Sequence, residues 1–292
     1  MRGVKFLKII VVMDDATSGS GDLIAQHGAS FFLEISNGEE IRNILVDVGQ
    51  SSGMLFHNME RLCLSPEMVD IIVLTHCHYD HTGDLAEVVR AVGKRDLPVV
   101  AHPTLFRPHF AYRPCLRHIG VPYGNGPAEV EAAGGKLLLS TAPVPVLEGV
   151  TVLGEVPRTT DFEEPGVNAV TSLDDKLAED PLEDDTALAV YIEGQGVVVV
   201  TGCSHSGVIN ILRYSLELFP GMPLDGVLGG FHLIKADDRR IEKTVSAMAD
   251  LKPRWVAAGH CTGFNAQVAL RNRFKEAFEP LFVGKTMTIS TP

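Results

Sequence analysis

Cysteine is scarce in this sequence, and basic side chains are outnumbered by acidic ones. The 292 residues include only 5 cysteines, an odd number, and no two of them form a Cys-x-x-Cys pair. A disulfide framework is therefore not expected, and a reducing, cytoplasmic setting fits best. With 25 Lys and Arg against 37 Asp and Glu, the net charge is −12. That balance argues against a broad nucleic-acid surface and against electrostatic docking on anionic membranes.

Long apolar runs are also missing. No segment approaches the roughly eighteen apolar residues that a membrane-spanning helix needs. The apolar start at 6–13 contains Lys8 and ends in two aspartates without a cleavage-like site, so it does not indicate a signal peptide. Hydrophobic residues make up 45% of the sequence, which is typical of a soluble globular protein. No linker-like stretch divides the chain, so we expect a single domain over residues 1–292.

What the sequence does contain is a cluster of metal-binding side chains on a predicted turn. The apolar run 69–74 predicts a buried strand, and apolar residues at helical spacing follow from 85 to 92. Between them, four side chains that can bind metal fall within six residues: His76, His78, Asp80 and His81. A turn at the end of a strand can aim several side chains into one cavity, and such turns often carry function.

The spacing of these residues has a chemical interpretation. His76 and His78 stand two apart on an extended segment, so they point to the same side and can share one ion. Asp80 and His81 follow as the chain turns and can reach a second ion. Imidazole suits zinc, iron and similar metals, and a carboxylate can complete such a site. The alternative is a histidine-rich surface turn that binds nothing, but buried imidazoles without a metal would leave polar groups unpaired.

Hydrophobic periodicity and turn residues predict an alternation of strands and helices along most of the chain. The expected strands are 5–12, 30–36, 41–48, 69–74, 97–102, 136–140, 150–153, 187–192, 197–200, 226–228 and 255–258. The expected helices are 53–62, 85–92, 207–218, 239–251 and 266–278.

Five motifs carry a resemblance to a known family. Residues 75–83, Thr-His-Cys-His-Tyr-Asp-His-Thr-Gly, match the signature of the metallo-β-lactamase superfamily. Stretches at 154–163, 201–207, 229–233 and 259–263 resemble one subfamily, that of the archaeal dihydropterin-methyl ribofuranosylaminobenzene 5′-phosphate synthases of methanopterin biosynthesis. The resemblance implies an α/β fold, a four-layer αββα sandwich of two mixed β-sheets, with a two-metal site at one edge of the sheets.

The resemblance also implies the remaining ligands. In the superfamily one further histidine completes each ion, and an aspartate after a Thr-Gly strand end often bridges both. Here Cys203 stands in the place of that aspartate, and His205 is the expected third ligand of the first ion. His260 matches the superfamily's last histidine and is expected on the second ion. Cys203 is either a thiolate ligand or a buried inert cysteine, and we expect the second role. Asp47, in an Asp-x-Gly strand end, is expected to support a ligand rather than to bind metal itself.

We expect two divalent ions, zinc in preference to iron, manganese or magnesium. Their charge would create a positive pocket suited to a small phosphate or diphosphate substrate. The resemblance implies a transferase in which an aromatic amine displaces diphosphate from a dihydropterin-methyl diphosphate. One alternative is a hydrolase that uses a metal-bound hydroxide, with Asp80 as the catalytic group that accepts its proton. Another is a non-catalytic metal-binding or sensing protein. The sequence leaves the oligomeric state open.

The segment 103–126 is a basic, aromatic region in an acidic protein. Arg107, Arg113 and Arg117 are candidates for binding a substrate phosphate from a lid or pocket, and a surface segment with solvated arginines is an equal alternative. His232, beside a Gly-Gly pair that allows close approach, is expected to contact substrate. His27, in a motif similar to one of the subfamily, either lines the site or bonds to backbone.

The segment 161–185 has the opposite character, with ten carboxylates and one lysine. We expect a solvated, mobile excursion rather than a cation site. Its last part, Asp184–Asp185, adjoins a predicted strand and is expected to reach the edge of the site.

Overall fold

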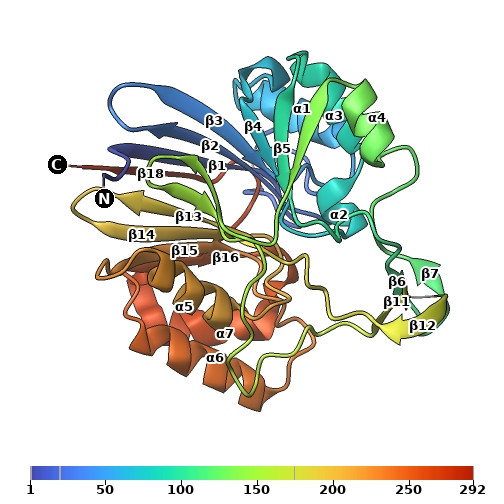
Figure 1. Ribbon diagram of the computed structural model, residues 1–292. Coiled ribbons are helices and arrows are strands. Elements are labelled where there is room, and N and C mark those ends of the chain that lie inside the picture. The colour runs from blue at the N-terminus through green and yellow to red at the C-terminus, as the bar shows by residue number, and fades with distance from the viewer. Residues whose placement is uncertain (1, 20, 174, 292) are drawn as a thin grey trace.

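The computed structural model describes residues 2–19, 21–173 and 175–291, and its core is two seven-stranded sheets packed face to face (Figure 1). The strands of the first sheet are, in spatial order, β18 (Thr286–Ser290), β1 (Phe6–Met13), β2 (Ser30–Ser36), β3 (Ile41–Val46), β4 (Ile71–Val73), β5 (Leu97–Ala101) and β8 (Gly135–Leu139). Those of the second are β17 (Phe278–Pro280), β16 (Trp255–Ala258), β15 (Leu224–Gly229), β14 (Gly196–Thr201), β13 (Ala187–Ile192), β10 (Val150–Val152) and β9 (Val144–Leu147).

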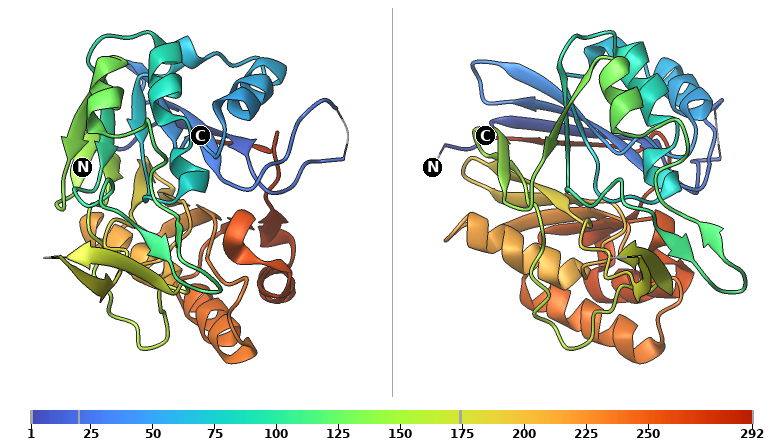
Figure 2. Two further views of the ribbon diagram at one scale, coloured as in Figure 1. Left: turned by 90° about the vertical axis from the view of Figure 1, so that its right-hand side faces the viewer. Right: turned by 45° about the vertical axis from the view of Figure 1, so that its right-hand side comes forward.

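Helices cover the outer face of each sheet, as the two views of Figure 2 also show. On the first sheet these are α1 (Ser52–Arg61), α3 (Leu85–Val92) and α4 (Pro127–Ala132), and on the second α5 (Val208–Leu218), α6 (Asp238–Asp250) and α7 (Phe264–Phe274). Shorter turns are the helix α2 (Tyr79–Thr82) and the 3₁₀ segments η1 (Pro66–Met68), η2 (His260–Thr262) and η3 (Lys275–Ala277). None of the helices in the described ranges is long and apolar enough to cross a membrane.

Strand periodicity explains why the sequence forms these layers. Successive side chains of a strand point to opposite faces, so a strand covered on both sides must be apolar throughout. In β14, Val198 and Val200 pack between the two sheets, whereas Val197 and Val199 pack against the helices of the second sheet. The resulting arrangement is the predicted αββα sandwich, and the prediction of the fold class is confirmed.

Both sheets are mixed, and their parallel halves place one set of strand ends together. In the first sheet β3, β4, β5 and β8 run parallel, and in the second β14, β15, β16 and β17 do. Parallel strands end at the same edge, and in open α/β sheets ligands bind outside the carboxyl ends of the strands. The segments that follow β3, β4, β14, β15 and β16 therefore meet along one edge of the sandwich.

A third sheet, which the sequence did not predict, lies outside the sandwich. Its four strands are, in order, β12 (Lys176–Glu179), β11 (Ala169–Leu173), β6 (Phe110–Ala111) and β7 (Arg117–His118). The basic segment 103–126 supplies β6 and β7, and the acidic segment 161–185 supplies β11 and β12. The two segments predicted as separate excursions thus form one structure, seen at the right of Figure 1.

The C-terminal part also differs from the prediction of one helix over 266–278. Helix α7 ends at Phe274, and Phe278 begins β17, which runs parallel to β16. The last strand, β18, then pairs with the edge strand β1. Apolar residues in 266–278 continue from the helix into a short strand, so their spacing does not show where the helix ends. The boundary is set by the free edge of the second sheet, with which β17 pairs.

Candidate metal centre

Three histidines converge where strands of both sheets end. His76 and His78 follow β4, and His205 follows β14. The Nδ1 atom of His78 lies 3.1 Å from Nε2 of His76 and 3.2 Å from Nε2 of His205. Ligands about 2.0–2.1 Å from a tetrahedral ion lie about 3.3 Å from one another. The three nitrogen atoms therefore have the spacing of one metal's ligands.

A second group of donors surrounds Asp80. Its Oδ2 atom lies 3.5 Å from Nε2 of His81 and 3.4 Å from Nε2 of His260, and the two imidazole nitrogens are 3.2 Å apart. His260 begins the turn after β16, whereas Asp80 and His81 belong to α2. The structure thus brings all six predicted ligands together at this edge, and their assignment to two ions stays a prediction.

Cys203 lies inside this second group. Its sulfur is 3.3 Å from Nε2 of His81 and 3.3 Å from Nε2 of His260, and it also lies within 4.8 Å of donor atoms of His76 and His205. A sulfur among four imidazoles is not in apolar surroundings, so the geometry favours the thiolate-ligand alternative over a buried inert cysteine. Burial and the neighbouring Cys261 raise the pKa of the Cys203 thiol, so a cation is needed for it to ionise there.

Hydrogen bonds from groups outside the two sets hold the imidazoles in place. Asp47, fully buried, lies 2.7 Å from Nδ1 of His81 and also accepts the backbone N–H of Thr75 at 2.7 Å. The carbonyl of Pro165 lies 2.8 Å from Nδ1 of His205. Each bond leaves Nε2 of the same ring to face the ion, which is the usual arrangement around metal-binding histidines.

Asp15 is a supporting residue that the sequence interpretation missed. One of its oxygens lies 2.7 Å from Nδ1 of His260, and the other lies 2.9 Å from Nδ1 of His27. Burial pushes the pKa of Asp15 upward, but the hydrogen bonds from these two histidines outweigh it and lower the pKa. The signal in the sequence was the acidic pair at the end of the first strand, followed by a glycine- and serine-rich loop.

Asp184 and Asp185 reach the site, as their position before β13 predicted. Asp184 accepts the backbone N–H of Cys77 at 2.6 Å, between the histidines of the first motif. Asp185 accepts the backbone N–H of Ser206 at 2.8 Å, next to His205. Both are fully buried, in contrast to the solvated excursion expected for the rest of the acidic segment. Burial raises the pKa of Asp185 to about 6.

Backbone conformation and a glycine also shape the site. Asp47, Ser204, His232 and His260 have positive φ angles of 57°, 63°, 44° and 48°. Such values are uncommon for residues other than glycine and concentrate at functional sites. A Cβ at Gly202 would lie 2.0 Å from Oγ1 of Thr75, so only glycine allows β14 to approach the motif loop this closely.

Burial favours the neutral form of the first three histidines. Burial lowers the pKa of His76, of His78 to about 3, and of His205, and the neighbouring histidines lower those of His76 and His205 further. Nε2 of His78, buried, has no partner within the described part of the chain. Neutral rings have a lone pair available, which is the form that metals bind. For Asp80, burial alone would raise the pKa, but His81 and His260 lower it well below the usual value.

A cavity of about 220 Å³ opens between these donors and the third sheet. Cys203, Asp80, His78 and His260 line it from the metal side, together with His27 and His232. His27 is 51% exposed and lies 3.3 Å from Asp80, so it bonds to carboxylates rather than to backbone. The ring centroid of His232 lies 4.2 Å from that of His205, with the rings tilted by 49°, and its Nδ1 has no partner among the described residues.

The three candidate arginines separate in the structure. Arg113 and Arg117 line the metal cavity from the third sheet, but Arg107 is not among the described residues that line it. Instead, Nη2 of Arg107 lies 2.8 Å from Oδ1 of the buried Asp180. A carboxylate of the acidic segment thus already pairs with the charge of Arg107, and a phosphate role for this residue stays a prediction.

The family model of the metallo-beta-lactamase superfamily matches residues 27–260. A 7,8-dihydropterin-6-methyl-4-(beta-D-ribofuranosyl)-aminobenzene-5'-phosphate synthase of Methanocaldococcus jannaschii is 33% identical over 96% of this chain and 95% of its own. An uncharacterised protein of the same organism is 34% identical over 84% of this chain and 88% of its own.

Solved structures share the fold. A metal-dependent hydrolase of the β-lactamase superfamily superposes with a TM-score of 0.80 at 24% identity, covering 98% of this chain and 100% of the other. The metallo-β-lactamase fold protein YhfI of Bacillus subtilis gives a TM-score of 0.58 at 13% identity, covering 97% of this chain and 99% of the other. At these identities the likeness concerns the fold alone.

Proposed function

The chain belongs to the metallo-β-lactamase superfamily, and on that premise we propose that it is a metal-dependent enzyme that joins a dihydropterin-methyl group to an aminobenzene carrying a ribose 5-phosphate. The relative from Methanocaldococcus jannaschii is named as the synthase of that product. The observation that carries the proposal is the cavity itself, which has two sets of metal-binding side chains on one side and Arg113 and Arg117 on the other.

The donor sets fit two divalent ions. We assign one ion to His76, His78 and His205 and the other to Asp80, His81 and His260, with Cys203 as a further ligand of the second. Nitrogen spacings of 3.1–3.2 Å within the sets support the assignment, and the mixture of imidazole, carboxylate and thiolate suits zinc. When bound, the two ions would hold a diphosphate group and stabilise the negative charge that develops on its leaving oxygen.

The side chains of the cavity supply the remaining roles. Arg113 and Arg117 would bind substrate phosphate oxygens, since a guanidinium donates two parallel hydrogen bonds to such groups. The amine nitrogen forms the new bond to the methylene carbon as the carbon–oxygen bond to diphosphate breaks, and the nitrogen then loses a proton. An aryl ammonium is far more acidic than an alkyl ammonium, so a weak base is sufficient. His232, through its Nδ1 that has no partner among the described residues, can accept that proton.

Hydrolysis is the second candidate, and one observation favours it. His27, which lies beside Asp80, is half-exposed, so water can reach the second donor set. In that case Asp80 would accept a proton from the attacking water. A protein that only stores or senses metal needs no such cavity lined by arginine, so that alternative is the weakest. The five free thiols support a reducing compartment, as the predicted cytoplasmic location requires.

A direct assay tests both reactions. Zinc-loaded protein is incubated with dihydropterin-methyl diphosphate, with and without ribofuranosylaminobenzene 5′-phosphate, and products are identified by mass spectrometry. The proposal predicts a coupled product and diphosphate release only when the amine is present. Release of phosphate or diphosphate without the amine, and no coupled product with it, would mean that the enzyme is a hydrolase.

The arginines provide the second test. Replacing Arg113 or Arg117 by Ala should weaken binding of the diphosphate substrate by about 1.5–3 kcal/mol, the contribution of a hydrogen bond to a charged group. The variant Arg95→Ala is the control, because Arg95 is 96% exposed and lies outside the cavity. Unchanged affinity in both variants would support the alternative that these arginines are solvated surface residues.

A further inference from the structure

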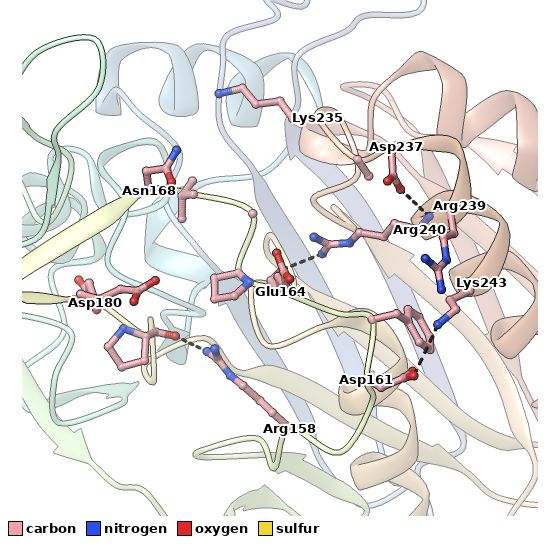
Figure 3. A pocket seen from close by; sticks show the side chains of 17 residues that line it. Arg158, Asp161, Glu164, Asn168, Asp180, Lys235, Asp237, Arg239, Arg240 and Lys243 are labelled. Atoms are coloured by element: carbon pink, nitrogen blue, oxygen red, sulfur yellow. Dashed lines mark hydrogen bonds and ion pairs between the residues drawn. The ribbon is translucent and has the colours of Figure 1, made fainter.

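A larger cavity of about 1130 Å³ adjoins the metal cavity. It lies between the segment 161–168 and the start of α6, and Figure 3 shows Arg158 on the side across from Arg239 and Lys243. Gly166, Val167, Asn168 and Lys235 line both cavities. One segment of chain and one lysine therefore separate the larger cavity from the metal-binding side chains.

Positive charge without an ion-pair partner is concentrated here, although the protein is acidic. Arg239 and Lys235 have no ion-pair partner within the described part of the chain. Arg240 donates from Nη2 to the backbone carbonyl of Glu164 at 2.7 Å, and its Nε is buried without a partner. Arg158 donates from Nη2 to the carbonyl of Leu182 at 2.9 Å. Because a carbonyl has no net charge, these bonds orient the guanidinium groups without neutralising them.

Two of the five carboxylates of the same cavity are paired with a cation. Asp161 pairs with Lys243 at 3.6 Å, and Asp180 is bound by Arg107. Asp237 caps α6 by accepting the backbone N–H of Arg240 at 2.8 Å, and this bond leaves its charge in place. Glu164, Glu179 and Asp237 therefore stand against four cations that we call the basic groove: Arg158, Lys235, Arg239 and Arg240. The remaining positive charge favours an anionic ligand.

We propose that the basic groove binds the phosphate monoester of the second substrate, the 5-phosphate on the ribose of the aminobenzene. The proposal rests on the function proposed above and specifies where that substrate lies. The substrate would pass over Asn168 and Lys235, with its amine in the metal cavity and its phosphate between Arg158 and Arg239. Arginine forks bind a phosphate dianion by paired hydrogen bonds, and the oriented Arg240 supplies a third guanidinium.

The probe is ribose 5-phosphate, titrated by calorimetry into the full-length, metal-loaded protein saturated with inorganic diphosphate. On the function proposed above, diphosphate fills the metal cavity, so the titration reports the groove. We expect ribose 5-phosphate to bind and ribose not to bind. Arg239→Ala should weaken binding at least about tenfold, as expected for loss of a charged hydrogen bond. Arg239 is exposed and has no ion-pair partner among the described residues, so its removal leaves the fold intact. Arg95→Ala is the matched control and should bind normally.

Two outcomes overturn the proposal: no binding of ribose 5-phosphate once diphosphate is present, or equal affinity in Arg239→Ala and the native protein. The first would place the phosphate at the metals, and the second would place it outside the groove. Failure of the proposed function is a separate result. If the coupled product never forms but Arg239→Ala still weakens binding of ribose 5-phosphate, the groove is a phosphate site of a different reaction.

Discussion

The loops after β4, β14 and β16, which carry the proposed metal ligands, face the same cavity as the third sheet. The two regions are built in different ways. Each metal-binding loop follows a strand of a seven-stranded sheet, and its ligands are held by buried hydrogen bonds such as that between Asp47 and His81. The third sheet contains two strands of only two residues, β6 and β7. Its two segments are joined by the pairing of β6 with β11 and by the buried carboxylate of Asp180, which binds Arg107. One region is fixed by the core, whereas the other depends on a few contacts between segments distant in sequence.

We therefore expect substitutions of the proposed metal ligands to remove metal without destabilising the fold. His205→Ala should lose most of one of two ion equivalents, because two imidazoles cannot hold the ion at neutral pH. Cys203→Ser should keep the first ion and bind the second more weakly, since the sulfur lies 3.3 Å from His81 and His260 but the other donors remain. Metal analysis of the purified variants, with circular dichroism as the control for folding, tests both.

The opposite result is equally informative. If the serine variant keeps both ions at full affinity, the sequence-based expectation of an inert Cys203 was right, and the sulfur merely fills space between the two sets. If the His205 variant keeps both ions, the first set is wrongly assigned.

The difference between the regions also explains what the sequence could predict. The ligands His76, His78, Asp80 and His81 stand in one short segment, and the strand before it is apolar enough to be recognised as buried, so their position at a sheet edge followed from local pattern alone. The strands β2, β13 and β16 have the predicted bounds for the same reason.

The third sheet could not be found in this way. Strands β6 and β11 lie nearly sixty residues apart, and β6 is too short to show alternation. The pairing of Arg107 with Asp180 is a tertiary event, and charge composition alone suggested two solvated segments of opposite sign. Asp15 was missed because nothing local links the first strand's end to His260, 245 residues away.

The second prediction therefore targets Asp180. Asp180→Asn would leave the nearly buried Arg107 and the buried His109 without their carboxylate, and breaking a buried ion pair typically costs about 3–5 kcal/mol. We expect faster hydrogen exchange in 110–118 and 169–179 and an unchanged metal content. Glu179→Gln, an exposed neighbour on β12, is the control and should exchange at the native rate. Loss of metal in Asp180→Asn would contradict this and would show that the metal-ligand loops depend on the third sheet.

The smallest expected effect is the pH dependence of the same contact. Burial alone would lower the pKa of His109, but its hydrogen bond to Asp180 and the nearby Asp184 outweigh burial and raise it above the ordinary 6.5. Asp180 shifts in the opposite sense: burial would raise its pKa, but His109, the backbone N–H of Leu182 and Arg107 lower it below 3.8.

The sign follows from linkage. A histidine whose folded pKa is raised contributes its full stability below pH 6.5 and loses it as the pH rises through the folded value. The Asp180 contribution is present above pH 3.8 and is lost only as the pH falls through its lowered value. Between these limits both residues contribute their full stabilisation.

Opening of the third sheet should therefore become easier on the alkaline side, by at most about 1.4 kcal/mol per pH unit. Exchange of the β6 and β11 amides, corrected for intrinsic rates at pH 6, 7.5 and 9, measures this. His109→Gln should remove the dependence, whereas a slope that persists in the variant would assign it to another group. The neighbouring His118 cannot be that group, because burial and the charge on His109 lower its pKa and a lowered histidine pKa makes stability rise with pH.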